Sequence, residues 1–376
     1  MSSTFLDIHV LQTVPPSNIN RDDTGSPKTA IFGGSRRARV SSQAWKKAVR
    51  KSFSNVLDES ELGMRTKRVV ELLGTQIHTL DPAIELAQAQ ALASAALKTA
   101  GIKIEAASKN KDADPKPATA GYLLFVSNLQ ARRLAELVVA EHNGGETLTK
   151  KQAKEVLDSG HSIDIALFGR MIADSADLNV DASCQVAHAI SVHPVETEFD
   201  YFTAVDDVNS EEESGAGMIG TVEFNSSTLY RYATVNLNGL LQNLGDGAAT
   251  VKAVEAFVRA FIESMPTGKQ NTFANRTLPD AVVVSLRERQ PVNLVGAFEE
   301  AVVPVEGRGR LQVASERLAA YSTELNEAFS QSPVKTFVIS PTTATAALEN
   351  LGEKTTMDAL ITSLGEDLAS RVGSLA

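Results

Sequence analysis

Basic side chains are concentrated in one short segment of this sequence. Between Arg21 and Lys51 there are nine Lys or Arg residues and two Asp residues, whereas the whole chain of 376 residues has a formal net charge of −10. Exposed charges farther apart than about 8 Å are screened at physiological salt, so an acidic protein can still offer a polyanion a basic surface. Ser41 or Ser42 is placed to cap a helix, whose free N–H groups suit phosphate oxygens. The segment therefore favours contact with nucleic acid.

Two other groups of residues could hold a metal ion. The adjacent carboxylates Asp22-Asp23 and Asp206-Asp207 could bind a divalent cation for phosphodiester cleavage, but Asx turns explain such pairs without a metal. His188 and His193 lie close to Cys184 in the sequence. Their spacing does not bring three ligands together on one helix face, so we interpret them as ordinary core or surface residues. The sequence therefore predicts no metal site.

A glycine string, Gly215–Gly220, has the letters of a dinucleotide-binding fingerprint. That motif needs an apolar strand before it and a helix after it, whereas an acidic run precedes this one. We interpret it as the tip of a hairpin. The sequence also contains neither a nucleophile elbow nor a phosphate-binding loop, and we predict no cofactor and no catalysis.

The apolar residues near the basic segment predict the elements that position it. Alternation over Phe5–Val14 predicts a strand that the following two prolines should end, and Arg37–Val40 predicts a second, short strand. After Ser42, apolar residues recur every three or four positions from Trp45 to Val56 and predict a helix. Two pairs of cations lie one helical turn apart on its other side, Lys46 with Arg50 and Lys47 with Lys51.

The rest of the chain predicts an α+β protein. Residues from Met64 to Leu157 are alanine-rich and helical in pattern, and a long segment, Pro194–Phe224, lies between two apolar runs. Further strands are predicted at Ile163–Phe168, Leu229–Leu237, Ala281–Leu286 and Val334–Ile339, and further helices at Ala253–Met265 and Leu311–Phe329.

Composition narrows the class of protein. With 43% hydrophobic and 22% charged residues the chain can bury a sizeable core. The single cysteine, Cys184, excludes an intrachain disulfide and a thiolate metal cluster. The N-terminus has no signal-peptide pattern, and no apolar run reaches the roughly 18 residues that span a bilayer. We therefore expect a cytoplasmic protein that does not contact a membrane.

Seven motifs, in order along the chain, together resemble CasC, the Cas-seven (Cse-four) family of backbone subunits in the type I-E CRISPR surveillance complex, Cascade. They are Asn20–Asp23, Ala30–Gln43, Lys46–Lys51, Ile165–Met171, Ala187–Ile190, Phe202–Asp207 and Tyr230–Ala233. Each motif alone is a weak signal, but this many in register is specific. The helical insertion and the last hundred residues or so match only by pattern.

The resemblance implies a hand-shaped subunit. It implies an RRM-like (ferredoxin-like) palm from residues 1–60, 161–193 and 225–376, helical fingers from residues 61–160 and a β-hairpin thumb from residues 194–224. It also implies that copies stack head to tail into a helical filament along CRISPR RNA, with other Cascade subunits, and present the guide for pairing with target DNA.

The resemblance also assigns roles to particular residues. Guide phosphates or sugars would be held by Asn20, Arg21, Lys28, Ser41, Gln43, Lys46, Lys47, Arg50 and Arg68. Arg170 and Met171 would lie on the palm beneath the guide. The thumb wedge would be Tyr201, Phe202, Thr203 and Val205, where Tyr201 replaces the family's tryptophan but keeps a stacking face. Duplex DNA would meet the fingers at Lys150, Lys151 and Lys154.

These observations leave three hypotheses. The first is a non-catalytic protein that organises RNA in antiviral defence. The second is a metal-dependent ribonuclease, motivated by Asp22-Asp23 beside the basic segment and by related backbone subunits of other CRISPR types. The third is a pyridine-nucleotide enzyme that uses the glycine string.

Overall fold

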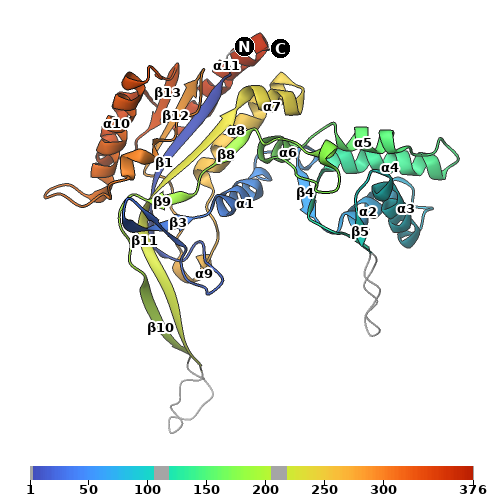
Figure 1. Ribbon diagram of the computed structural model, residues 1–376, viewed down its shortest axis with the longest axis horizontal. Coiled ribbons are helices and arrows are strands. Elements are labelled where there is room, and N and C mark those ends of the chain that lie inside the picture. The colour runs from blue at the N-terminus through green and yellow to red at the C-terminus, as the bar shows by residue number, and fades with distance from the viewer. Residues whose placement is uncertain (1–2, 106–117, 205–217, 376) are drawn as a thin grey trace, which may run out of the picture. The chain divides into compact units, whose positions relative to one another are not determined.

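The computed structural model describes residues 3–105, 118–204 and 218–375, and the chain forms two compact units. The first, which we call the sheet unit, comprises Met1–Ser52, Gln185–Asn236 and Val254–Leu368. The second, the helical unit, comprises Phe53–Cys184, Leu237–Ala253 and Ala369–Ala376. Figure 1 shows the elements of both units. In this division the helical unit also contains residues 53–60, 161–184, 237–253 and 369–376. The palm, fingers and thumb that the resemblance implies stay predictions.

A mixed sheet with mostly antiparallel pairs forms the centre of the sheet unit. Its longest strands, β1 and β11, pair with each other, and β1 also pairs with β12. The order along the sheet is β14 (Glu353–Lys354), β13 (Lys335–Ile339), β12 (Ala281–Arg287), β1 (Phe5–Ser17), β11 (Met218–Asn236), β9 (Ala189–Ser191), β3 (Ser35–Val40) and β2 (Thr29–Phe32), while β8 (Cys184–Val186) and β10 (Glu198–Ala204) also pair with β11.

The middle strands of the sheet are buried on both faces. On one face, Leu11 and Val283 belong to an apolar cluster with Val313 and Leu318 of helix α10 (Arg310–Ala328). The short 3₁₀ helices η3 (Leu294–Phe298) and η4 (Thr343–Leu351) contribute to the same cluster. On the other face, Leu6, Ile8 and Val10 are fully buried, as are the inner residues of helices α8 (Gly247–Glu263) and α11 (Met357–Leu375). The short helix α9 (Gln270–Phe273) completes this unit.

The helical unit has its own apolar core, built largely from alanine and leucine. Helix α2 packs against α3 and α4, and α4 packs against α5. The elements are η1 (Glu59–Glu61), β4 (Gly63–Thr66), α2 (Val69–Leu80), α3 (Leu86–Thr99), β5 (Ile104–Glu105), β6 (Thr119–Ala120), β7 (Leu124–Ser127), α4 (Asn128–His142), α5 (Lys150–Leu157), α6 (Ile163–Phe168), η2 (Ala176–Leu178) and α7 (Leu237–Leu244). Helix α1 (Ser42–Phe53) belongs to the sheet unit, except for its last residue, Phe53.

The structure confirms the α+β class and most of the predicted elements, and it corrects two. Ile163–Phe168, predicted as a strand, is helix α6, which follows Ser162 and ends at Gly169, where φ is 77°. A short apolar run fits a buried helix and a buried strand equally well, so periodicity could not decide. Pro15 and Pro16, predicted to end the first strand, lie inside β1, where the register with β11 shifts between Val14 and Ser17. An irregularity of this kind accommodates proline, because no ladder hydrogen bond is needed there.

Candidate nucleic-acid interface

Helix α1 presents cations to solvent because its opposite face is buried. Trp45, Val49 and Phe53 recur every four residues and are at most 1% exposed. Lys46, Lys47, Arg50 and Lys51 lie between these apolar positions and are half-buried or exposed. We call the surface formed by this helix, the loop from Asn20 to Lys28 and the strand pair β2–β3 the basic ridge.

A buried arginine supports the helix from below. The guanidinium carbon of Arg231, on β11, lies 3.8 Å from the ring centroid of Trp45. Arg231 donates hydrogen bonds to Gln12 Oε1, at 2.6 Å, and to the carbonyl of Phe261. Burial lowers the pKa of Arg231 to about 9. The charged platform therefore fixes the position of α1 without being accessible to a ligand.

The loop that carries Asn20 and Lys28 is tied to the start of α1. Asn20 Oδ1 accepts a hydrogen bond from the backbone N–H of Ser41, at 2.8 Å, and the Asn20 carbonyl accepts one from the N–H of Lys28. Ser41 Oγ in turn accepts from the N–H of Ala44, as an N-cap does. An open groove of about 560 Å³ runs along the loop, lined by Asn20, Arg21 and, from another segment, Gly268. The predicted residues of this region are therefore brought together.

The hairpin of β2 and β3 requires its glycines. Gly33 and Gly34 have φ values of 54° and 72°, and a Cβ atom on Gly33 would lie 1.6 Å from the carbonyl oxygen of Glu299. Arg37 in β3 is fully buried and donates to the carbonyls of Ser191 and Phe298. Not every cation in the basic segment is therefore available to a ligand, since Arg37 holds the hairpin against the sheet.

Arg39 lies at the junction of the ridge and the neighbouring strand. Its backbone N–H donates to the carbonyl of Lys28, and its Nε donates to the carbonyl of Thr29, at 3.2 Å. Strand β3 pairs with β9, with Arg39 opposite Ile190, which brings His188 within reach. Arg39 Nη1 lies 3.3 Å from His188 Nδ1. Sequence analysis interpreted His188 as an ordinary core or surface residue and gave it no role in RNA binding. Its proximity to Arg39 depends on strand pairing that spacing does not reveal.

The predicted thumb contains a two-stranded ribbon formed by β10 and the first part of β11. Tyr201 is 64% exposed and shares a face with Phe199, which is 65% exposed and which sequence reasoning missed. Phe202 lies opposite Gly220, where a Cβ atom would come within 2.4 Å of the Phe202 ring. Thr203 is exposed, and Val205 and Asp206-Asp207 lie outside the described residues. The ribbon therefore presents unburied aromatic rings.

The carboxylate pair beside the ridge has a local explanation. Asp22 Oδ1 accepts hydrogen bonds from the backbone N–H groups of Thr24 and Ser26 and from the Thr24 hydroxyl. The Thr24 hydroxyl is the main reason that the pKa of Asp22 lies below its ordinary value. This is the Asx turn that the sequence suggested. Over residues 3–105, 118–204 and 218–375, no three His, Cys, Asp or Glu residues are grouped to hold a metal ion.

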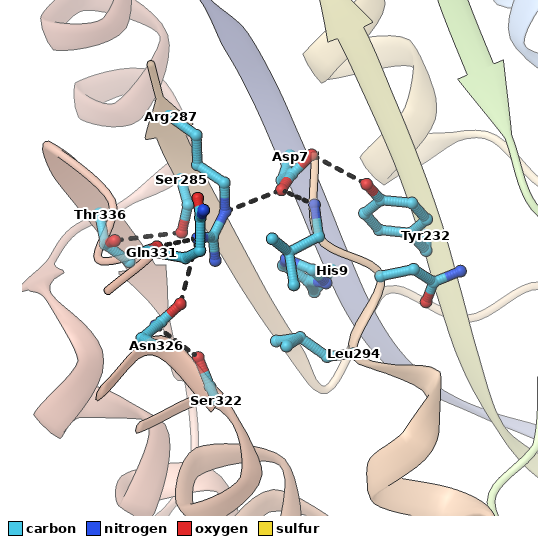
Figure 2. Close-up of polar contacts among 12 residues, drawn as sticks. Asp7, His9, Tyr232, Ser285, Arg287, Leu294, Ser322, Asn326, Gln331 and Thr336 are labelled. Atoms are coloured by element: carbon cyan, nitrogen blue, oxygen red, sulfur yellow. Dashed lines mark hydrogen bonds and ion pairs between the residues drawn. The ribbon is translucent and has the colours of Figure 1, made fainter. Parts of the chain in front are cut away.

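On the middle strands of the sheet, β12, β1 and β11, lies a buried polar network, shown in Figure 2. Asp7 on β1 and Arg287 on β12 form an ion pair with Nε and Oδ2 2.9 Å apart, and both side chains are at most 3% exposed. Tyr232 donates to Asp7 Oδ1, at 2.9 Å. Arg287 Nη1 donates to Asn326 Oδ1, at 3.1 Å. We call Asp7, Arg287, Tyr232, Asn326 and the adjacent His9 the buried network.

A family model for CT1975-like protein matches residues 6–363, which is nearly the whole chain. The protein belongs to the CT1975-like protein family. No curated protein matches the chain.

Two solved structures resemble this CT1975-like protein along almost all of its length. A chain described as "CRISPR RNA-guided surveillance complex, pre-nicking" is 34% identical with a TM-score of 0.82, and the match covers 96% of this chain and 100% of that one. A chain described as "CRISPR RNA-guided surveillance complex" is 29% identical with a TM-score of 0.71, covering 96% and 99%. These findings confirm the predicted relation to CRISPR surveillance complexes.

In this CT1975-like protein, three residues predicted to contact RNA lie in the helical unit. Arg170 is 5% exposed and donates to the carbonyls of Leu178 and Leu157, at 2.9 and 2.8 Å. Met171 is 82% exposed, and Arg68 is exposed and forms an ion pair with Glu71. Arg170 therefore orients the segment that displays Met171. Direct contact between Arg170 and RNA stays a prediction, and it would require Arg170 to give up its hydrogen bonds to these carbonyls.

The lysines predicted to meet DNA lie on helix α5. Thr149 caps this helix through Gln152, and Lys150 is exposed in its first turn. Lys151 is 3.7 Å from Glu155, and Lys154 forms an ion pair with Asp177. Two of the three lysines therefore already have carboxylate partners, which weakens their attraction for a polyanion.

Among the described residues, no helix is long and apolar enough to cross a bilayer.

Proposed function

We propose that this protein is a non-catalytic backbone subunit of a type I-E CRISPR surveillance complex, Cascade, and that it binds CRISPR RNA. The observation that carries the proposal is the match to a surveillance-complex chain over 96% of this chain and all of that one. The basic ridge supplies an independent reason, because cations grouped around a helix N-terminus suit a phosphate backbone.

The proposed contacts are to backbone and shape rather than to sequence. Asn20, Lys28 and Ser41 lie together at the start of α1, where phosphate or sugar oxygens would meet N–H groups and cations. Tyr201 and Phe202, exposed on the ribbon, would stack on or displace a base. Guide bases between these contacts would remain free to pair with target DNA, so base pairing supplies the specificity.

Assembly would follow from a head-to-tail contact between copies. Such an interface does not close on itself, so it produces a helical filament whose length is set by the RNA and by capping subunits. Within this proposal the sheet unit is the RRM-like palm, helix α5 faces target duplex DNA through Lys150, and the other Cascade subunits are partners. A subunit on a guide RNA would act in the cytoplasm.

We also propose that the protein does not cut RNA. Asp22, a carboxylate within the ridge, is already engaged by Thr24 and Ser26 in closing its own loop. Incubation of the assembled protein with complementary RNA and Mg²⁺ should leave the target intact. If the wild-type protein cleaves the target RNA and the Asp22→Asn variant does not, the ribonuclease hypothesis would replace this proposal.

The assembly is tested by purification of the protein with CRISPR RNA and its partner subunits. We expect a high ratio of absorbance at 260 nm to that at 280 nm, and curved particles in negative stain that fall apart with ribonuclease. A particle that keeps its shape and its subunit content after ribonuclease would contradict an RNA-organised backbone.

The hypothesis of a pyridine-nucleotide enzyme is tested by thermal shift. Added NAD⁺ or NADP⁺ should not raise the melting temperature of the protein.

A further inference from the structure

The contact between Arg39 and His188 determines which form of the imidazole is present. A guanidinium has no acceptor, so Arg39 Nη1 must donate to His188 Nδ1, and the neutral ring then carries its proton on Nε2. His188 is exposed. Its Nε2–H is therefore a neutral donor at the surface, with its orientation set by Arg39.

Other groups around this histidine are also suited to an anion. Lys28 is joined to Arg39 through the bond between the Arg39 N–H and the Lys28 carbonyl. Among the residues that the structure describes, no carboxylate forms an ion pair with Lys28 or Arg39. Two of the five N–H donors of a guanidinium are engaged in Arg39, by Thr29 and His188, which leaves three for a ligand.

The electrostatic state of His188 agrees with this geometry. Burial is the largest cause that lowers the pKa of His188, and the charges of Arg39 and Lys28 lower it further. The ring is therefore neutral near pH 7 and keeps its acceptor toward Arg39, rather than losing that hydrogen bond by protonation.

We propose that Lys28, Arg39 and His188 form a phosphodiester-binding subsite on the basic ridge, next to the contact at the start of α1. This inference rests on the proposed RNA-binding function and adds two residues, Arg39 and His188, to it. Arg39 contributes charge and orients the ring, and His188 Nε2 donates a hydrogen bond to a phosphate oxygen. Because Lys28 is joined to Asn20 and Asn20 to Ser41, this phosphate would neighbour the one at the helix N-terminus.

The test measures binding of a fluorescein-labelled single-stranded RNA of mixed sequence to the full-length protein over a range of salt concentrations. His188→Leu removes the donor and should weaken binding about fivefold, whereas His188→Gln keeps an N–H and should stay within about twofold. Arg39→Ala should weaken binding about tenfold and reduce the salt slope by about 0.7. Arg289→Ala, an exposed cation after β12, is the matched control and should bind like the wild type.

A spectroscopic measurement separates a direct contact from a structural role. In protein labelled with ¹⁵N-histidine, the imidazole signals of His188 should report the Nε2–H tautomer, and added RNA should shift Nε2 more than Nδ1. In Arg39→Ala the free protein should show a mixture of tautomers. If Arg39→Ala does not fold, the comparison of His188→Leu with His188→Gln still tests the proposed contact between His188 and RNA.

A reference variant, Lys46→Ala with Arg50→Ala, distinguishes the two proposals. If it loses RNA binding while His188→Leu and Arg39→Ala bind like Arg289→Ala, the subsite is wrong and the RNA-binding function stands. If the wild-type protein binds no RNA, alone or with its partner subunits, both proposals are wrong.

Discussion

Two regions of the central sheet, the buried network on its middle strands and the basic ridge at the edge formed by β3 and β2, treat positive charge in opposite ways. In the buried network, Arg287 is almost fully buried, and its charge is matched by Asp7 and by hydrogen bonds. In the basic ridge, Lys28 and Arg39 lie at the surface without a carboxylate partner among the described residues. A buried charge must be compensated inside the fold, whereas an exposed charge is solvated and can stay without a partner until a ligand binds. The comparison teaches that arginine content alone does not locate a binding surface, since burial and pairing decide which cations remain available.

The largest expected effect comes from breaking the buried pair. Asp7→Ala leaves Arg287 buried without its partner and should lower the free energy of unfolding by about 3 to 5 kcal/mol, as denaturant titration would measure. Asp358→Ala, where the carboxylate is 88% exposed and pairs with Arg259, is the matched control. It should change stability by less than about 1 kcal/mol. Equal losses in both variants would remove the distinction between a buried and an exposed ion pair.

The next effect concerns the ridge and should appear in binding rather than in stability. Lys46→Ala with Arg50→Ala should weaken single-stranded RNA binding by about 3 kcal/mol, roughly a hundredfold, at about 1.5 kcal/mol for each charged contact. The salt slope should fall by about 1.4 and equally for all sequences. The pair Arg289→Ala and Arg317→Ala serves as the charge-matched control. A loss confined to some RNA sequences would argue against backbone recognition.

Acid should destabilise the buried network through His9. Burial, with a further contribution from Arg287, lowers the pKa of His9 to about 3, below its ordinary 6.5. The stabilisation is therefore complete above pH 6.5 and is lost as the pH falls toward 3, with a slope approaching about 1.4 kcal/mol per pH unit. Between pH 6.5 and 5 the wild type should lose about 1.6 kcal/mol more than His9→Gln. Parallel pH profiles of unfolding for the two proteins would contradict this assignment.

The smallest effect should come from the ribbon. Tyr201→Ala should weaken RNA binding by about 1 kcal/mol, because one stacked base is lost, and should leave the melting temperature unchanged since the ring is exposed. Tyr201→Phe keeps the ring and should bind like the wild type. If Tyr201→Phe binds as weakly as Tyr201→Ala, the hydroxyl rather than stacking makes the contact.

Local patterns predicted the ridge well, because a helix, its cap and its charged face are encoded within a few residues. The spacing of Trp45, Val49 and Phe53 indicates the buried face of α1 and leaves the lysines outside. Long-range contacts could not be predicted in this way. The burial of Arg170 depends on carbonyls of Leu157 and Leu178, and the pairing of Arg39 with His188 depends on β3 lying beside β9. In both cases residue type suggested chemistry, and tertiary structure decided its role.

The continuity of strand β11 from the ribbon into the sheet has a mechanical consequence. The first residues of β11, Met218–Phe224, pair with β10, and from Asn225 to Asn236 the same strand pairs with β1 in the centre of the sheet. At about 3.3 Å per residue, this one strand of 19 residues extends roughly 60 Å without interruption. A pull on the ribbon is therefore directed along β11 and loads its hydrogen bonds with β1 in shear, all together rather than one after another. Force applied through a base held by the ribbon would be borne by the long pair of strands β1 and β11.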